Sequence, residues 1–248
     1  MKEIDRYFQI FSATLRNFTS RCLKKIHPLA KQQISREKSF HGSNYGGWTL
    51  CPTGLDHESI VFSIGVGEDA SFDRSVIESY GAQVYAFDPT PRSIDWVAAQ
   101  AWPPGFHFYP YGLADRNGSR SFHPPENPDH VSHSLLEKRE TEKSSIEVEF
   151  RTISELSKLV GHKNIDVLKM DIEGAEYEVI QDILAQNRIF VHQILVEFHD
   201  FFPEIPLRKT LQTIRSLNQA GYVIFHISPN GREYSFIKVD DEIDEPQS

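Results

Sequence analysis

The chain has 248 residues, 39% of them hydrophobic and 25% charged, which is typical of a globular protein with a full core. Its formal net charge of −9 argues against non-specific nucleic-acid binding, because such binding requires a basic surface that neutralises phosphates. Two cysteines are too few for a disulfide framework or a zinc site, and the lack of a membrane-length apolar run or a signal-peptide core predicts a cytoplasmic protein without a transmembrane segment.

An apolar stripe with helical spacing runs through residues 4–26 and predicts an amphipathic helix in an N-terminal extension, residues 1–40. The stripe consists of Ile4, Phe8, Phe11, Leu15, Phe18, Cys22 and Ile26. We expect this helix to pack on the main domain. Two alternatives remain open: a homodimer contact through the heptad-like spacing, and a membrane-surface contact supported by neighbouring basic residues.

A polar, turn-rich stretch follows at residues 31–58, with Gly46, Gly47 and Trp48 near its centre. Two interpretations are open for this stretch. It is either a flexible arm that lays an aromatic ring on a ligand, or a connector whose Trp48 fills a surface groove.

Residues 60–88 contain the pattern around which the domain is organised. The apolar run at their start predicts a buried parallel strand, and Gly65, Val66 and Gly67 follow it at once. Apolar residues at helical spacing come next, and a second strand ends at Asp88. The stretch is therefore a βαβ unit with glycines at its first turn and a carboxylate at the tip of its second strand.

Each part of this unit suits a ligand that contains a nucleoside. Glycines let the backbone approach a ligand closely, and the helix N-terminus presents free N–H groups to it. The carboxylate of Asp88 can accept both hydroxyls of a ribose. We expect either a dinucleotide or S-adenosylmethionine; the alternative is that Gly65 and Gly67 merely close a tight turn and Asp88 caps a loop.

The middle of the chain predicts a helix over residues 93–101 and a third strand over residues 106–113. In a nucleotide-binding α/β fold the end of this strand lies beside the adenine. Residues 119–146 show no core periodicity, and we expect a lid over the active site there. We expect its histidines to be solvated rather than to bind metal; they are His123, His130 and His133.

The second half predicts further helices and strands that end in an antiparallel hairpin. The helices cover residues 153–160, about 176–186 and 207–220, and the strands cover 165–170, 192–198, 222–227 and 234–239. Dinucleotide enzymes usually continue with parallel βα units, whereas class I methyltransferases insert a reversed last strand into the sheet. The hairpin therefore favours S-adenosylmethionine.

Residues 167–176, Val-Leu-Lys-Met-Asp-Ile-Glu-Gly-Ala-Glu, resemble the signature of FkbM-type S-adenosylmethionine-dependent methyltransferases. The glycine turn and the Val-Glu-Phe-His at 196–199 stand where that family has its counterparts. Gly-Gly-Trp at 46–48, with Phe-Asp-Pro at 87–89, is similar to a methyltransferase-like branch of the family.

The resemblance spans about residues 45–240 and implies a Rossmann-like class I methyltransferase fold. That fold is α/β, with a mostly parallel seven-stranded sheet and a terminal antiparallel hairpin. We accordingly place the methyltransferase domain at residues 41–240, after the N-terminal extension and before an acidic tail at residues 241–248 that we expect to be disordered.

We expect the cofactor to be bound at the strand ends of this domain. The expected contacts are Ser63, Gly65, Val66, Gly67, Asp88, Pro89, Gly112, Leu113 and Asp171. The candidate base and orienting groups stand at neighbouring strand tips, and they are Asp171, Glu173, Glu197 and His199.

Three readings of these groups remain open. Carboxylates with an imidazole suit a divalent metal, Asp171 and Glu173 can instead cap a helix, and His199 can be purely structural.

The sequence thus predicts an S-adenosylmethionine-dependent methyltransferase, with O-methylation of a small-molecule or glycan hydroxyl as the expected reaction and no nucleic-acid partner. Two rival classes remain. One is an NAD-dependent oxidoreductase, and the other is a catalytically silent module that binds S-adenosylmethionine.

Overall fold

The computed structural model describes residues 23–24, 27–122, 146–186 and 188–239. The apolar stripe of the N-terminal helix, the three histidines of the expected lid and the acidic tail lie outside these residues. Within the described residues, no helix is both long and apolar enough to cross a membrane.

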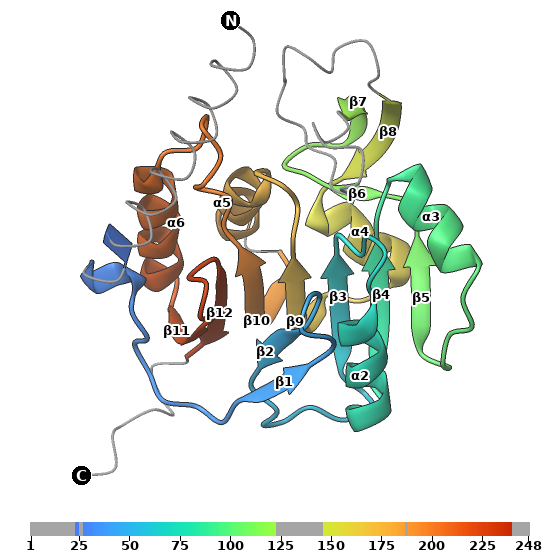
Figure 1. The fold of residues 1–248 in the computed structure, drawn as a ribbon, viewed down its shortest axis with the longest axis horizontal. Helices are drawn as coiled ribbons and strands as arrows, with labels where there is room; N and C mark the ends of the chain where they lie inside the picture. Colours follow the sequence, from blue (N-terminus) through green and yellow to red (C-terminus); the bar gives the residue numbers. More distant parts are fainter. Residues whose placement is uncertain (1–22, 25–26, 123–145, 187, 240–248) are drawn as a thin grey trace, which may run out of the picture.

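A seven-stranded sheet forms the centre of the domain, in the order β11-β12-β10-β9-β3-β4-β5 (Figure 1). Its strands are β3 (Ile60–Ile64), β4 (Gln83–Phe87), β5 (Phe106–Tyr109), β9 (Asn164–Met170), β10 (Phe190–Glu197), β11 (Tyr222–Ile227) and β12 (Glu233–Lys238). The pairs from β10 through β9, β3 and β4 to β5 are parallel, whereas β12 is antiparallel to both of its neighbours. The expected fold class is confirmed, including the reversed last strand inserted between β10 and β11.

Helices and one hairpin cover the two faces of this sheet. They are α2 (Ser71–Tyr80), α3 (Pro91–Ala98), α4 (Ile153–Val160), α5 (Glu176–Gln186), α6 (Leu207–Gln219), and the pair β1 (Ser39–His41) and β2 (Trp48–Leu50); a short 3-10 helix, η1 (Pro28–Ala30), precedes them. Successive residues of a strand point to opposite faces, so Leu168 packs with α4, α5 and α6 while Val167 packs with α2 and β2. The central strands are therefore buried on both sides, which is why their sequences are continuous apolar runs.

The third strand differs from its expected bounds of 106–113. Strand β5 ends at Tyr109, because Pro110 has no N–H to continue the ladder. The chain then forms β6 (Gly112–Leu113), which joins β8 (Ile146–Arg151) and β7 (Gly118–Phe122) in a separate sheet of order β6-β8-β7. The expected lid thus has a strand at each end, beyond the carboxyl end of β5 (Figure 1).

The stretch 31–58 is a connector that contributes to the core. Trp48 is only 6% exposed and packs with Leu50 and Val61, whereas Tyr45 between the two strands is 91% exposed. The structure agrees with the connector interpretation, except that Trp48 lies in the core rather than in a surface groove.

The segment before β1 also contacts the domain. Helix η1 packs against α6, and the backbone N–H groups of Gln33 and Ile34 donate to the carbonyl of Ile224 in β11. Lys24 is buried, with Nζ 2.8 Å from the carboxylate of Asp200.

Candidate active site

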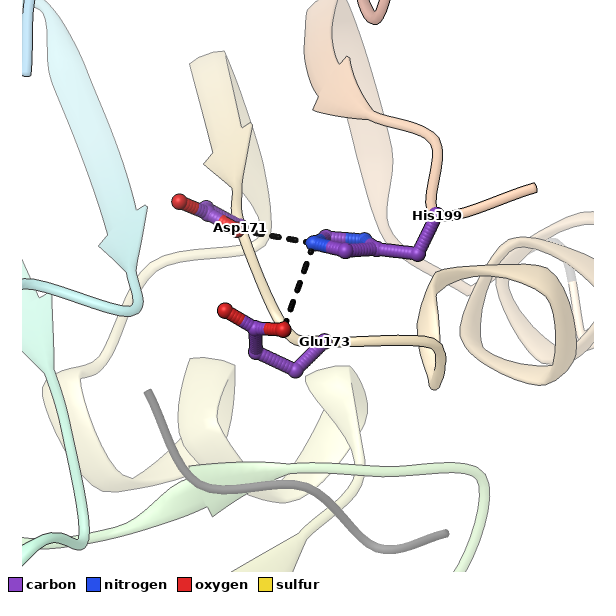
Figure 2. Close-up of side chains that lie close together, drawn as sticks. All are labelled: Asp171, Glu173 and His199. Carbon is purple, nitrogen blue, oxygen red and sulfur yellow. Dashed lines mark ion pairs between the residues drawn. The ribbon is translucent and has the colours of Figure 1, made fainter. Parts of the chain in front are cut away.

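The predicted catalytic side chains come from the ends of two neighbouring parallel strands. Asp171 directly follows β9, Glu197 is the last residue of β10, and His199 lies two residues beyond it. Because β9 and β10 are paired in parallel, their carboxyl ends meet at one edge of the sheet. Figure 2 shows Asp171 and Glu173 pointing toward the ring of His199.

The imidazole of His199 is the centre of this group. Its Nε2 lies 3.5 Å from Oδ1 of Asp171 and 3.6 Å from Oε2 of Glu173 (Figure 2). The His199 side chain is only 2% exposed, whereas those of Asp171 and Glu173 are 34% and 19% exposed. The structure therefore brings together three of the four predicted catalytic residues, with the carboxylates on the outer side of the ring.

A fourth acid, Glu176, holds the other side of the His199 ring. Its Oε1 lies 3.3 Å from Nδ1 of His199 and accepts the backbone N–H of the same residue at 2.9 Å. Its Oε2 accepts the N–H of Gly174 at 2.8 Å, and the side chain is fully buried. In the sequence, Glu176 stands out only as part of the signature. Its position in the first turn of a helix does not indicate a contact with His199, which follows β10.

The backbone between β9 and α5 is shaped to present Glu173. This residue has φ 53°, in the left-handed region that side chains other than glycine rarely adopt, and Gly174 follows with φ 105°. Helix α5 begins only at Glu176, so Asp171 and Glu173 do not occupy its N-cap position.

Two ionisable groups of the site have displaced pKa values. Burial opposes charge on His199, but Glu176, Asp171 and Glu173 outweigh it and raise the pKa of the imidazole to about 10. Burial, reinforced by the charge of Asp171, raises the pKa of Glu197 to about 8. The His199 value records how strongly the surrounding carboxylates favour positive charge at the ring.

Glu197 lies beside an aromatic and basic group that sequence reasoning did not identify. Nη1 of Arg232, in the turn before β12, is 4.0 Å from Oε1 of Glu197. The guanidinium of Arg232 also lies 3.9 Å from the ring centre of Phe201. This edge of the site thus offers both a planar cation and an aromatic ring to a bound molecule.

The glycine turn after β3 adjoins the Asp171 backbone. The N–H of Asp171 donates to the carbonyl of Ile64, and a Cβ on Gly65 would lie 1.9 Å from the Asp171 carbonyl oxygen. Gly67 has φ 59° and no atom within 4 Å of where its Cβ would lie. Gly65 is therefore required by close packing, whereas Gly67 leaves the turn open.

Asp88 is joined directly to this turn. Its Oδ2 accepts the N–H of Gly67 at 2.9 Å, and its Oδ1 accepts from the backbone N–H and the hydroxyl of Thr90 at 2.9 and 2.7 Å. The residue is 5% exposed. Asp88 thus connects the ends of β3 and β4, and its Oδ2, which accepts one hydrogen bond here, has further acceptor capacity for a ligand.

Lys169 is a second functional candidate that sequence reasoning missed. Its Nζ donates to the carbonyl of Gly65 at 2.6 Å and to that of Ile64 at 3.3 Å, from a buried position on β9. It also lies 5.6 Å from the ring centre of Trp48. The signal in the sequence was a lysine inside the apolar run at the end of β9. Its two hydrogen bonds hold the carbonyls at the start of the glycine turn in place.

Several expected cofactor contacts are buried in the core instead of being open at the site. Ser63 is fully buried within β3 beside Asp73 of α2, and Val66 is buried against α3. Gly112 and Leu113 are buried in β6, where Gly112 packs on the ring of Phe150. Pro89, next to Asp88, is half-buried.

Comparisons with known proteins point to one family. A family model described as the methyltransferase FkbM domain matches residues 63–224. The human probable methyltransferase-like protein 24 is 23% identical over 176 residues, which cover 67% of this chain and 42% of that protein. The 2-O-methyltransferase NoeI of Sinorhizobium fredii is 25% identical over 180 residues, 64% of this chain and 72% of that protein.

The chain thus spans less than half the length of the human relative. Among solved structures, Methanococcus jannaschii fibrillarin is similar with a TM-score of 0.43 and 12% identity, over 86% of this chain and 85% of that chain. Aeropyrum pernix fibrillarin with natively bound S-adenosyl-L-methionine gives a TM-score of 0.41 and 12% identity, over 84% and 85%.

Proposed function

The chain belongs to the FkbM methyltransferase family, and on that basis we propose that it transfers a methyl group from S-adenosylmethionine to a hydroxyl of a small-molecule or sugar acceptor. The observation that carries the proposal is the convergence of Asp171, Glu173 and His199 at the strand edge next to the glycine turn. The relative NoeI, named as a 2-O-methyltransferase, supports oxygen as the acceptor atom.

The residues of the glycine turn fit the cofactor. Gly67 has a left-handed backbone conformation that favours glycine, and the space that a side chain would fill there is open. The Asp88 carboxylate beside it suits ribose hydroxyls. Lys169 fixes the two carbonyls at the base of the turn. S-adenosylmethionine, when bound, supplies a methyl group on a positively charged sulfur, which is open to attack by a nucleophile.

The remaining task of the site is to hold the acceptor and take its proton. A neutral hydroxyl is a weak nucleophile, so a base must accept its proton at or before attack. The backbone of Asp171 is packed against the glycine turn, and its carboxylate is partly exposed beside Nε2 of His199. We assign Asp171 as the base and Glu173 and Glu197 as groups that orient the acceptor. His199 is assigned as the group that positions Asp171 and Glu173.

Most of the rate enhancement is expected to come from alignment. Holding two reactants in line can supply about 7–11 kcal/mol of the barrier. The Arg232–Phe201 pair next to Glu197 gives the acceptor a surface on which to lie. Because this surface is both aromatic and charged, it suits a polar molecule with an apolar face, such as a sugar.

The test is acceptor-dependent formation of S-adenosylhomocysteine by the full chain, measured by mass spectrometry with a panel of hydroxylated small molecules and glycans. Asp171→Asn keeps the size of the side chain but removes its basicity, so transfer should fall by about a hundredfold or more. Glu178→Gln, in the same helix region but exposed and paired with Lys209, is the matched control.

Calorimetry with S-adenosylmethionine and NAD separates the rival functions. Binding of NAD without binding of S-adenosylmethionine would replace the proposal with an oxidoreductase. Binding of S-adenosylmethionine without transfer to any acceptor or cell extract would reduce the protein to a silent binding module.

A further inference from the structure

We propose that Asp171, Glu173 and His199 bind one divalent transition-metal cation, which holds the acceptor oxygen during methyl transfer. The role in transfer rests on the proposed function, whereas the cation site itself rests on the geometry of the three side chains. One ligand atom from each residue can be chosen so that all three lie within 4.8 Å of one another (Figure 2).

The spacing of these atoms suits a shared cation better than direct hydrogen bonds. Nε2 of His199 lies 3.5 and 3.6 Å from the two carboxylate oxygens, longer than the roughly 2.7–3.2 Å of an N–H···O hydrogen bond. Two adjacent ligands on a cation bonded at about 2.1–2.4 Å are roughly 3.0–3.4 Å apart. The two distances to His199 are slightly wider, and the oxygens of Asp171 and Glu173 lie within 4.8 Å of each other, so small shifts of these side chains would bring the three atoms onto one cation.

The second observation is the orientation of the His199 ring. The side chain is 98% buried, since its exposed fraction is 2%, and Nδ1 is held by the carboxylate of Glu176. A buried carboxylate on one ring nitrogen is the usual support for a metal-binding histidine, because it fixes the ring and directs the other nitrogen at the metal. Nε2 of His199 is accordingly aimed between Asp171 and Glu173.

The acids contribute the charge that a cation requires. Oδ1 of Asp171 is buried and accepts no hydrogen bond from the residues that the structure describes. With Glu176 included, three carboxylates surround one imidazole. A buried acceptor atom in a strongly acidic site is the environment that a divalent cation stabilises.

The ligand types indicate which cation fits. Calcium and magnesium prefer oxygen ligands only, whereas an imidazole with two carboxylates suits first-row ions such as Mn²⁺ and Zn²⁺. Three protein ligands leave coordination positions for the acceptor oxygen. A cation there would lower the pKa of the bound hydroxyl, and the Asp171 carboxylate, which gives one oxygen to the cation, would keep its other oxygen to take the proton.

Mn²⁺ is the probe for the test, because its electron paramagnetic resonance signal distinguishes free from bound ion. The full chain, stripped with EDTA and without S-adenosylmethionine, should bind one Mn²⁺ per chain. Asp171→Asn and Glu173→Gln should each weaken binding by about tenfold or more, and Glu176→Gln by about 10–100-fold, as for other supporting residues. Glu178→Gln should bind like the wild type.

Pulsed resonance of Mn²⁺ bound to the wild-type chain makes the test independent of how the variants fold. It should show coupling to an imidazole nitrogen. Absence of saturable binding, absence of the nitrogen coupling, or equal weakening by Glu178→Gln would each overturn the site.

Methyl transfer with and without EDTA separates this inference from the proposed function. Full transfer in EDTA would overturn the role of the cation and leave the methyltransferase standing. Binding of Mn²⁺ by a chain that does not bind S-adenosylmethionine would leave the cation site standing and remove the methyltransferase.

Discussion

Oε1 of Glu176 accepts the backbone N–H of His199 at 2.9 Å and lies 3.3 Å from Nδ1 of the same residue. One buried carboxylate therefore fixes both the main chain and the ring at the end of β10. Its other oxygen holds the N–H of Gly174, so the turn after β9 and the end of β10 share a single support.

Glu176→Ala should lower the free energy of unfolding by about 3 kcal/mol or more, because it leaves two backbone N–H groups and a charged imidazole without their acceptor. Urea denaturation checks this value. Glu178→Ala, two residues along and half exposed, should stay within about 0.5 kcal/mol of the wild type. Equal losses in the two variants would show that Glu176 supports nothing specific.

The two glycines of the first turn should respond differently to alanine. Gly65→Ala places a Cβ 1.9 Å from the Asp171 carbonyl oxygen, and the backbone shift should cost about 3 kcal/mol of stability. Gly67→Ala meets no atom and adds only left-handed strain, about 1–2 kcal/mol, while it obstructs the cofactor. Denaturation and calorimetry with S-adenosylmethionine measure both effects, and a Gly67→Ala variant with wild-type affinity would contradict the prediction.

Asp88→Ala should weaken binding of S-adenosylmethionine by about 1.5–3 kcal/mol, the range for a hydrogen bond to a charged group. Because Asp88 also accepts from Gly67 and Thr90, the variant should unfold at lower denaturant as well. Asp95→Ala, an exposed acid in α3, is the control for both measurements. Unchanged affinity in a folded Asp88→Ala chain would show that this carboxylate does not hold the ribose.

Lys24 and Asp200 form a buried ion pair whose side chains are 6% and 3% exposed. Lys24→Met leaves the Asp200 charge buried without its partner, which should cost about 3–5 kcal/mol. Replacing both residues, with Asp200→Leu added, should restore much of that loss, whereas the exposed Lys31→Met should change little. Thermal denaturation decides the matter: a double variant no more stable than Lys24→Met would argue against the pair.

The same pair bears on how the N-terminal extension can be tested, for example by deleting residues 1–26. Deleting them removes Lys24 and should destabilise the domain, so cofactor binding by the truncated chain must be measured below its own melting temperature.

His41 should give stability an acid-sensitive component. It is buried, its two ring nitrogens lie 2.9 Å from the hydroxyls of Ser75 and Tyr80, and burial lowers its pKa from the usual 6.5. The unfolded chain therefore takes up the proton first, so this contribution is present above pH 6.5 and is lost as the pH falls below it.

The measurement is the difference in unfolding free energy between the wild type and His41→Gln from pH 7.5 to 5. That difference should shrink toward the acid end. The exposed His57→Gln, in the following loop, should show no such trend. A difference that stays constant with pH would contradict the prediction, because it would mean that folding leaves the pKa of His41 unchanged.

The parallel half of the fold could be predicted because each element carries its own local signal. Apolar runs in the sequence predicted β3, β9 and the terminal hairpin. Gly81 marked the end of α2, where it adopts the left-handed conformation with φ 73°. The small sheet was missed although Ile146 to Arg151 alternate apolar and charged residues, since its partner β7 reads as a polar turn.

The site was predictable in the acids and the histidine that follow the strand ends, because the parallel pairing of β9 and β10 brings those ends together. Glu176 acts on His199, 23 residues away, and Lys169 acts across to β3, 104 residues away in sequence. Such contacts join residues that are far apart in the sequence, so a local sequence pattern does not reveal them.

The antiparallel pair β7–β8 has a practical consequence for protein engineering. Phe122 and Ile146 are paired at the last position of the ladder, so the chain that joins them leaves and re-enters the domain at adjacent points. The two points of attachment, Phe122 and Ile146, are thus held side by side by β7 and β8, which fixes where a replacement segment would be joined to the domain.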